Sequence, residues 1–134
     1  MKDLVIAIDP GREKCGIAVV HKQKGVLYKN IVNSSELIQD VLLNLDNYQT
    51  NLIVIGSGTS STKVRQKLET AHNKLNVVVV DEYRTTDAAR IRYWQENPPS
   101  GFKRFIPVTM MVPPVPVDDY AAVIIAERYL YQVR

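Results

Sequence analysis

The segment Leu4–Gly11, with the sequence LVIAIDPG, decides the fold of this chain. Five consecutive apolar residues end at an acidic residue and a strong turn signal, which predicts a central strand buried on both faces. Gly16–Val20, GIAVV, predicts a second strand, and Gly25 separates it from a third strand over about residues 26–32. Strands joined by a short connection that contains glycine form a hairpin, so this part of the sheet is expected to be antiparallel.

The rest of the chain alternates between helical and strand patterns. Asn33 and Glu36 form a capping-box pattern ahead of a helix, and Ser60 or Ser61 can cap a second helix. The apolar faces expected to be buried are those of Leu37, Ile38, Val41, Leu42 and Leu45 in the first helix, Val64, Leu68, Ala71 and Leu75 in the second, and Ala122, Ile125 and Tyr129 in the last. The further strands are expected at residues 52–55 and 77–80, and the later helices at residues 86–95 and from Asp118 onward.

This order of elements predicts one α/β domain over residues 1–134. Two strand–helix–strand units imply right-handed crossovers, so the first, fourth and fifth strands are expected to be parallel. The expected fold is a mixed five-stranded sheet with helices on both faces, in three layers. A hydrophobic content of 46% in 134 residues supplies one core and argues against two full domains.

Composition excludes several classes of protein. The net charge of +3 is compatible with a polyanionic partner but does not require one. The single cysteine, Cys15, forms no intramolecular disulfide and no zinc cluster. The apolar run that ends at Asp9 is too short for a signal peptide or a membrane span, so a cytoplasmic protein without membrane contact is expected.

Acidic residues stand at the ends of predicted elements. Asp9 and Glu82 follow parallel strands, whose carboxyl ends meet at one edge of a sheet. Asp118 begins the last helix, whose positive end favours an ionised carboxylate. Three clustered carboxylates repel one another, and Mg²⁺ or Mn²⁺ ions bound to their oxygens relieve that repulsion. The pattern predicts a site for two metal ions roughly 4 Å apart, which activates water and hydrolyses a phosphodiester.

Each acid taken alone has a plainer explanation. Asp9 can belong simply to a turn, Glu82 to the surface at a strand end, and Asp118 or Asp119 to a helix cap. The metal site depends on the convergence of all three.

Three motifs occur in the order found in one known family. Asp9, Gly11 and Gly16 have the spacing DxGxxxxG. Residues 80–89, VDEYRTTDAA, carry an acid ahead of Thr-Thr and Ala-Ala pairs, and residues 117–122, VDDYAA, place an acid three residues before a small pair. Together they resemble the motifs of the YqgF (RuvX) family of RuvC-like proteins. Its members are described as Holliday junction resolvases or as nucleases that mature the precursor of small-subunit ribosomal RNA.

The resemblance covers nearly the whole chain and implies an RNase H-like fold. It implies that Asp9, Glu82 and Asp118 are the catalytic metal ligands. Its spacing selects Asp118 over Asp119, which remains a candidate fourth ligand or a cap.

Three positions depart from the family pattern. Tyr83 separates Glu82 from Arg84, whereas the family's arginine follows its glutamate directly. Gly56–Thr59 replaces a Gly-Pro pattern, and the Pro-rich stretch Met110–Pro116 replaces Lys-rich sequence. These departures affect the expected substrate and activity rather than the fold.

Basic residues offer contacts to a nucleic-acid backbone, and aromatic residues interleaved with them offer stacking for unpaired bases. The alternative is an amphipathic helix with its aromatics in the core, which we favour for Trp94. Ser57–Ser61 leads into a helix and is either a phosphate site or a simple capped turn. The candidate phosphate contacts are Arg12, Lys14, Arg84, Lys103 and Arg104.

The sequence is also compatible with functions other than that of a nuclease. Actin-like ATPases and sugar kinases share the opening strand motif, but they close two such domains over a nucleotide, and this chain supplies one. A catalytically silent RNase H-like domain that binds nucleic acid or a protein remains the alternative. Branched DNA and structured RNA are both open as substrates, and a junction resolvase is expected to act as a homodimer.

Overall fold

The computed structural model describes residues 3–58, 60–72, 74–81 and 83–131. Its strands are β1 (Leu4–Asp9), β2 (Lys14–His21), β3 (Gly25–Asn33), β4 (Leu52–Gly56) and β5 (Asn76–Val80). Its helices are α1 (Leu37–Tyr48), α2 (Ser61–Ala71), α3 (Thr85–Glu96) and α4 (Asp118–Leu130), with short 3-10 helices η1 (Ser34–Glu36), η2 (Gly101–Phe105) and η3 (Val108–Met110). None of the helices within these ranges combines the length and apolarity needed to cross a membrane.

The five strands form one mixed sheet in the order β3-β2-β1-β4-β5. β1 pairs with β2 in antiparallel fashion and with β4 in parallel, so Ile8 lies opposite Ile17 on one side and Ile55 on the other. β2 and β3 are antiparallel, and β4 and β5 are parallel. The predicted antiparallel start and the parallel arrangement of the first, fourth and fifth strands are both confirmed.

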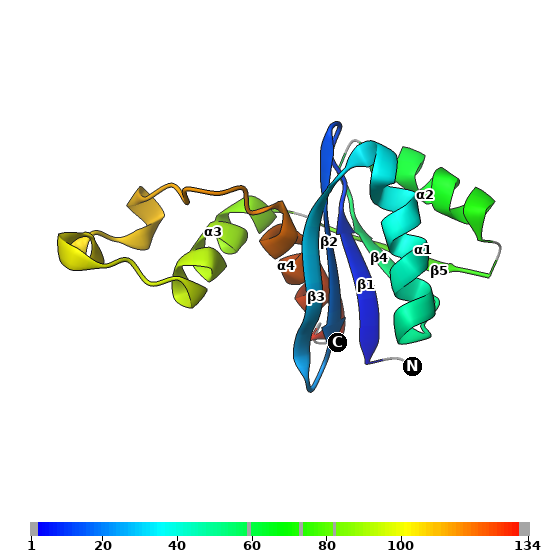
Figure 1. Ribbon diagram of the computed structural model, residues 1–134, viewed down its shortest axis with the longest axis horizontal. Coiled ribbons are helices and arrows are strands. Elements are labelled where there is room, and N and C mark those ends of the chain that lie inside the picture. The colour runs from blue at the N-terminus through cyan, green and yellow to red at the C-terminus, as the bar shows by residue number, and fades with distance from the viewer. Residues whose placement is uncertain (1–2, 59, 73, 82, 132–134) are drawn as a thin grey trace.

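β1 is buried on both faces, as its unbroken apolar sequence predicts. Ile6 and Ile8 have no exposed surface and belong to the core beneath α1 and α2. Val5 and Ala7 point the other way and belong to the core beneath α4. Figure 1 shows α1 and α2 together on one side of the sheet and α4 on the other. The predicted three-layer α/β architecture is therefore confirmed.

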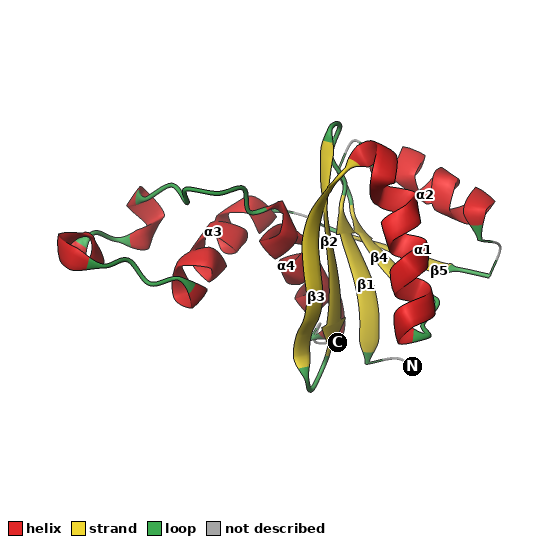
Figure 2. Cartoon of the chain, in the orientation of Figure 1, coloured by secondary structure: helices red, strands yellow, loops and turns green. Residues whose placement is uncertain are grey.

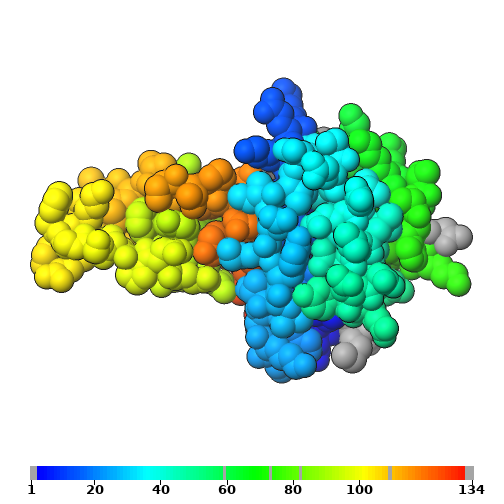
Figure 3. All heavy atoms as spheres, in the orientation of Figure 1, coloured from blue at the N-terminus to red at the C-terminus, as the bar shows by residue number. Residues whose placement is uncertain are grey.

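The third helix takes a different course from the other helices. α3 packs against α4 through Ala89, which is buried in a small cluster with Tyr120 and Ala121. Beyond α3, residues 97–117 form an extension that we call the arm, and it projects away from the sheet (Figure 2). In the space-filling view the arm and α3 form a separate lobe beside the body of the molecule (Figure 3).

Some local expectations were wrong. The side chain of Asn33 makes no capping hydrogen bond to the backbone, and a 3-10 turn intervenes before α1 begins at Leu37. Asn33 instead donates from Nδ2 to the carboxylate of Glu36 over 3.4 Å. Ala71 is exposed rather than buried, because α2 ends at that residue and its buried face, formed by Val64 and Leu68, is not continued. Leu75 still packs on the core, from the loop before β5.

Candidate functional site

Gly16 is the point where the end of β1 meets the start of α4. Asp9, the last residue of β1, pairs directly across the sheet with Gly16 on β2. A Cβ atom on Gly16 would lie 1.8 Å from the carbonyl oxygen of Asp118, which is far closer than atoms can approach. Only glycine therefore lets the first turn of α4 rest on β2 at this place. Gly16 therefore lies next to both Asp9, its partner on β1, and the backbone of Asp118 at the start of α4.

Asp9 continues the alternation of β1. Since successive side chains of a strand point to opposite faces, Asp9 shares the face of Val5 and Ala7, which is covered by α4. Asp9 is partly buried and makes polar interactions of its own. Two of the three predicted catalytic acids thus belong to the same face at the same edge of the sheet.

The carboxyl group of Asp118 is destabilised as an anion. Burial raises its pKa above the ordinary value, and the charge of Asp119 raises it further, whereas Lys14 acts to lower it. The position at a helix start predicted a lowered pKa, whereas burial and the charge of Asp119 raise it. A partly desolvated carboxylate next to another carboxylate suits a bound divalent cation, which would relieve both effects.

Asp119 is held by a neighbouring cation. Its Oδ2 atom accepts a hydrogen bond from Nζ of Lys29 on β3 over 3.0 Å, and the same ammonium lies 4.3 Å from the centre of the Tyr120 ring. Burial alone would lower the pKa of Lys29, but its bond to Asp119 raises the pKa overall. Asp119 therefore ties α4 to β3, and metal ligation by Asp119, which remains a prediction, would compete with Lys29.

The third predicted acid, Glu82, lies outside the described residues. Its neighbour Asp81 stands at the carboxyl end of β5, at the strand edge shared with β1 and β4. There Nη1 of Arg128 on α4 donates to the carbonyl of Asp81 over 3.0 Å. Within residues 3–58, 60–72, 74–81 and 83–131, no three acidic, histidine or cysteine side chains come close enough to hold a metal ion. The convergence of all three acids remains a prediction.

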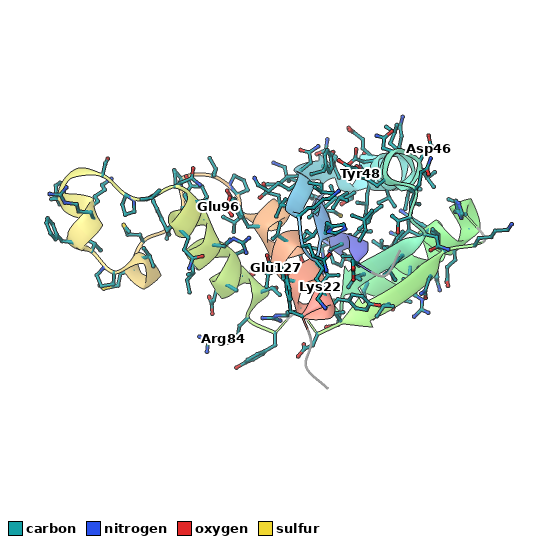
Figure 4. The ribbon with its side chains drawn as sticks, turned by 90° about the horizontal axis from the view of Figure 1, so that it is seen from below. Lys22, Asp46, Tyr48, Arg84, Glu96 and Glu127 are labelled. Atoms are coloured by element: carbon teal, nitrogen blue, oxygen red, sulfur yellow. The ribbon has the colours of Figure 1, made fainter. Side chains whose placement is uncertain are left out.

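The predicted phosphate contacts separate into two groups. Lys14, the first residue of β2, lies near Asp118, and Arg12 lies two residues earlier in the β1–β2 loop. Lys103 and Arg104 instead lie in η2 within the arm, remote from the sheet edge (Figure 1). Arg84 pairs with Asp87 over 3.2 Å and extends away from the body into solvent (Figure 4).

The aromatic residues of the second basic region also separate. Trp94 is partly buried and meets the ring of Tyr93 edge-on at 5.1 Å, but it belongs to none of the core clusters of the described residues, so the core-facing role that we favour remains a prediction. Phe102 and Phe105 are exposed on the arm, and the guanidinium of Arg104 lies 5.0 Å from the centre of the Phe105 ring. The amphipathic pattern of the helix favoured a core-facing position for Trp94, but the alternation of basic and aromatic residues could not establish the exposure of Phe102 and Phe105.

Some residues of this region were not singled out from sequence. Lys29 was missed because its partner Asp119 is 90 residues away in the chain. Ser34, which lies within hydrogen-bonding distance of the carbonyls of Gly11 and Arg12 at 3.1 and 2.8 Å, carried no recognisable signal either. Ser34 fixes the loop that bears Arg12 against the start of α1.

Compared by sequence, the chain matches no protein-family model and no curated protein. Compared by structure, it is similar to RuvC from Thermus thermophilus, with a TM-score of 0.58 and 16% identity over 96% of this chain and 97% of that chain. It is also similar to the Fowlpox virus resolvase, solved with Holliday junction DNA, with a TM-score of 0.57 and 9% identity over 95% of this chain and 96% of that chain. The mixed sheet, the helices on both faces and these likenesses establish an RNase H-like α/β fold.

Proposed function

We propose that this chain is a divalent-metal-dependent nuclease that hydrolyses phosphodiester bonds in structured nucleic acid, with Asp9, Glu82 and Asp118 as its metal ligands. The observation that carries the proposal is the approach of α4 to β2 at Gly16. The start of α4 can lie beside the end of β1, and so bring Asp118 near Asp9, only if the residue between them has no Cβ atom.

The chain's own residues support this chemistry in distinct ways. Asp118 is partly desolvated and Asp9 is partly buried, so both residues are only partly exposed to water at the end of the sheet that α4 covers. Lys14 lies where it favours the charged form of Asp118, and it would also attract a phosphate to that carboxylate. Bound metal ions would supply an activated water and stabilise the leaving oxygen.

The arm supplies the second part of the proposed function. Residues 97–117 contain two basic residues, Lys103 and Arg104, and no acidic residue. Phe102 and Phe105 flank that pair and are 76% and 77% exposed. Exposed aromatic rings beside cations suit unpaired bases and their phosphates. A branched or partly single-stranded nucleic acid offers both unpaired bases and accessible phosphates.

Structural similarity to two junction resolvases favours branched DNA, and the motif resemblance to the YqgF family adds the precursor of ribosomal RNA. A resolvase must cut two strands, so a symmetric dimer is part of the DNA version of the proposal. A catalytically silent RNase H-like domain that binds nucleic acid or a protein partner is the alternative.

The deciding experiment supplies Mn²⁺ with either a four-way DNA junction or a structured RNA precursor, and follows cleavage on a gel. We expect cleavage by the wild type and a loss of at least about a hundredfold in Asp9→Asn, since metal-bound water is lost. Asp46→Asn is the matched control, because Asp46 is exposed on α1, across the sheet from α4 (Figure 4).

Calorimetry with Mg²⁺ separates the nuclease from the silent domain. The wild type should bind the ion, and Asp9→Asn should bind it much more weakly. Absence of carboxylate-dependent metal binding, together with intact nucleic-acid binding, would establish the silent domain instead. Sedimentation of the wild type on a junction then tests for the dimer.

A further inference from the structure

A cavity of about 220 Å³ opens where the β1–β2 loop, the start of α1 and the first turns of α2 meet. Figure 1 shows these segments gathered at one edge of the sheet. Its inner wall includes Cys15, Leu37 and Val64, which belong to the core beneath α1 and α2. Asp9, in contrast, faces α4. The cavity therefore lies near the same edge as the acids but on the opposite face of the sheet.

Three cations surround this cavity. Arg12 approaches from the β1–β2 loop, and Lys63 and Lys67 approach from α2, where their spacing of four places them on one helical face. Among the residues that the structure describes, no acid lines the cavity and none of these three cations forms an ion pair. A concave site with uncompensated positive charge attracts an anion.

The loop that carries Arg12 is fixed in place before any ligand arrives. The hydroxyl of Ser34 lies 2.8 Å from the carbonyl oxygen of Arg12, and the backbone N–H of Ser34 donates to the carbonyl of Glu13 over 2.8 Å. A Cβ on Gly11 would lie 2.1 Å from the carbonyl oxygen of Lys14, so the tight turn requires glycine. Ordering this loop on binding therefore needs little further loss of entropy.

We infer that this cavity holds one phosphate group of the bound nucleic acid, on the face of the sheet opposite the cleaved bond; the inference rests on the proposed function. Pockets for drug-sized ligands span roughly 300–1,000 Å³, so 220 Å³ suits a phosphate better than a whole cofactor. Lys14 and Arg12 are two residues apart, yet one lies near Asp118 and the other lines the cavity. A nucleic-acid backbone that contacts both Lys14 and Arg12 would therefore pass around this edge of the sheet.

The salt dependence of binding tests this inference. Each neutralised phosphate contributes about 0.9 to the slope of log affinity against log salt concentration for duplex DNA. If Lys63 and Lys67 share one phosphate, then Lys63→Gln, Lys67→Gln and the double variant should each lower the slope, and the double variant should lose about one unit in total. Fluorescence anisotropy on a four-way junction without divalent ions gives these slopes independently of cleavage.

Lys74→Gln is the control, because Lys74 is an exposed lysine just before β5, at the opposite edge of the sheet. An unchanged slope in the double variant, as in Lys74→Gln, would overturn the phosphate site. A loss of about two units would show two separate phosphate contacts on an open surface and would also overturn it.

Two further outcomes separate this inference from the proposed function. Calorimetry with a nucleoside monophosphate shows whether a free phosphate compound fills the cavity; tight binding that the junction does not displace would overturn a nucleic-acid source. If the wild type binds no nucleic acid, the proposed function fails. The phosphate site is then tested by the calorimetry with the nucleoside monophosphate alone. If neither the wild type nor the double variant binds that compound, the phosphate site is contradicted as well.

Discussion

The sheet and the arm use apolar residues in opposite ways. In the sheet, Ile6, Ile17 and Ile55 have no exposed surface, and they stabilise the fold by burial. In the arm, Met110 and Val112 are 75% and 76% exposed. An exposed apolar side chain contributes little to the stability of its own chain, whereas a buried one contributes roughly 1.5–3 kcal/mol. The apolar residues of the arm are therefore available for contacts outside the chain.

The sharpest test of this difference compares two glycines. Gly16→Ala should lower the free energy of unfolding by roughly 3 kcal/mol or more, at or above the upper end of overpacking effects, because the new Cβ displaces α4 from β2. Gly101→Ala in the arm meets no atom within 4 Å and is strained only by its φ of 63°, so roughly 1 kcal/mol is expected. Urea denaturation measures both, and equal losses would contradict the distinction between sheet and arm.

The parts of the fold that could be predicted from sequence are those whose physical cause is local. β1 and β4 are unbroken apolar runs and are buried on both faces, as such runs predict. The valine run of β5 is equally unbroken, but β5 lies at the end of the strand order and Val79 is 42% exposed, so burial of such a run also depends on its place in the sheet. The end of β1 and the start of α4 could also be predicted, because acidic and turn-forming residues stand beside each of them in the sequence. Strand direction predicted a shared edge only for Asp9 and Glu82, whereas Asp118 was expected there on the assumption that the start of the last helix faces that edge.

The remaining features depend on tertiary contacts that leave no local signal. The spacing of Gly16 could be recognised, but its contact with Asp118 exists only once α4 has packed on β2. Lys63 and Lys67 look like ordinary solvated lysines of an amphipathic helix, and only the folded chain places them around a cavity with Arg12. The direction of the arm was equally hidden, because α3 has no strong apolar stripe.

A second prediction tests the arm on its own. Phe102→Ser with Phe105→Ser should change the free energy of unfolding by less than about 0.5 kcal/mol per site, as exposed substitutions do. Affinity for a nucleic acid with unpaired bases should fall by about 1–3 kcal/mol for each base that stacks on a ring. Anisotropy with a partly single-stranded DNA measures this, alongside thermal unfolding.

Leu43→Ser is the matched control, because Leu43 is an exposed apolar residue on α1 with 55% of its surface accessible. It should leave the affinity unchanged. If the phenylalanine variant binds as tightly as the wild type, the arm does not contact bases, and a fall in unfolding temperature instead would assign it a structural role.

A third prediction concerns the connection between the two regions. Arg92 on α3 donates to Glu127 on α4 over 2.8 Å and to Glu96 over 2.9 Å, with only 26% of its side chain exposed. Arg92→Gln should cost about 1 kcal/mol, the upper end for a partly exposed pair. Hydrogen exchange should quicken in α3 but not in the sheet. Arg65→Gln, which breaks the more exposed pair with Glu69 on α2, should have no such effect.

The smallest expected effect tests the acid at the site itself. The folded pKa of Asp118 is raised above its unfolded value by burial and by Asp119. Between these two values the folded chain binds more protons than the unfolded chain, so stability falls as pH rises through that window and stays lower above it. Asp118→Asn should therefore unfold at a slightly higher temperature than the wild type at pH 7, in the absence of divalent ions. The difference should close as pH falls through the raised pKa toward the ordinary value of 3.8.

Metal ions should make the wild type more stable than Asp118→Asn. An ion that binds only the folded state stabilises it in proportion to the logarithm of the ion concentration. Mg²⁺ should raise the unfolding temperature of the wild type and leave that of Asp118→Asn almost unchanged. Asp46→Asn, on the exposed surface of α1, should follow the wild type in every condition. A wild type that is already the more stable protein at pH 7 without metal would show that the carboxylate of Asp118 is not strained, and that the start of α4 serves the sheet rather than a bound ion.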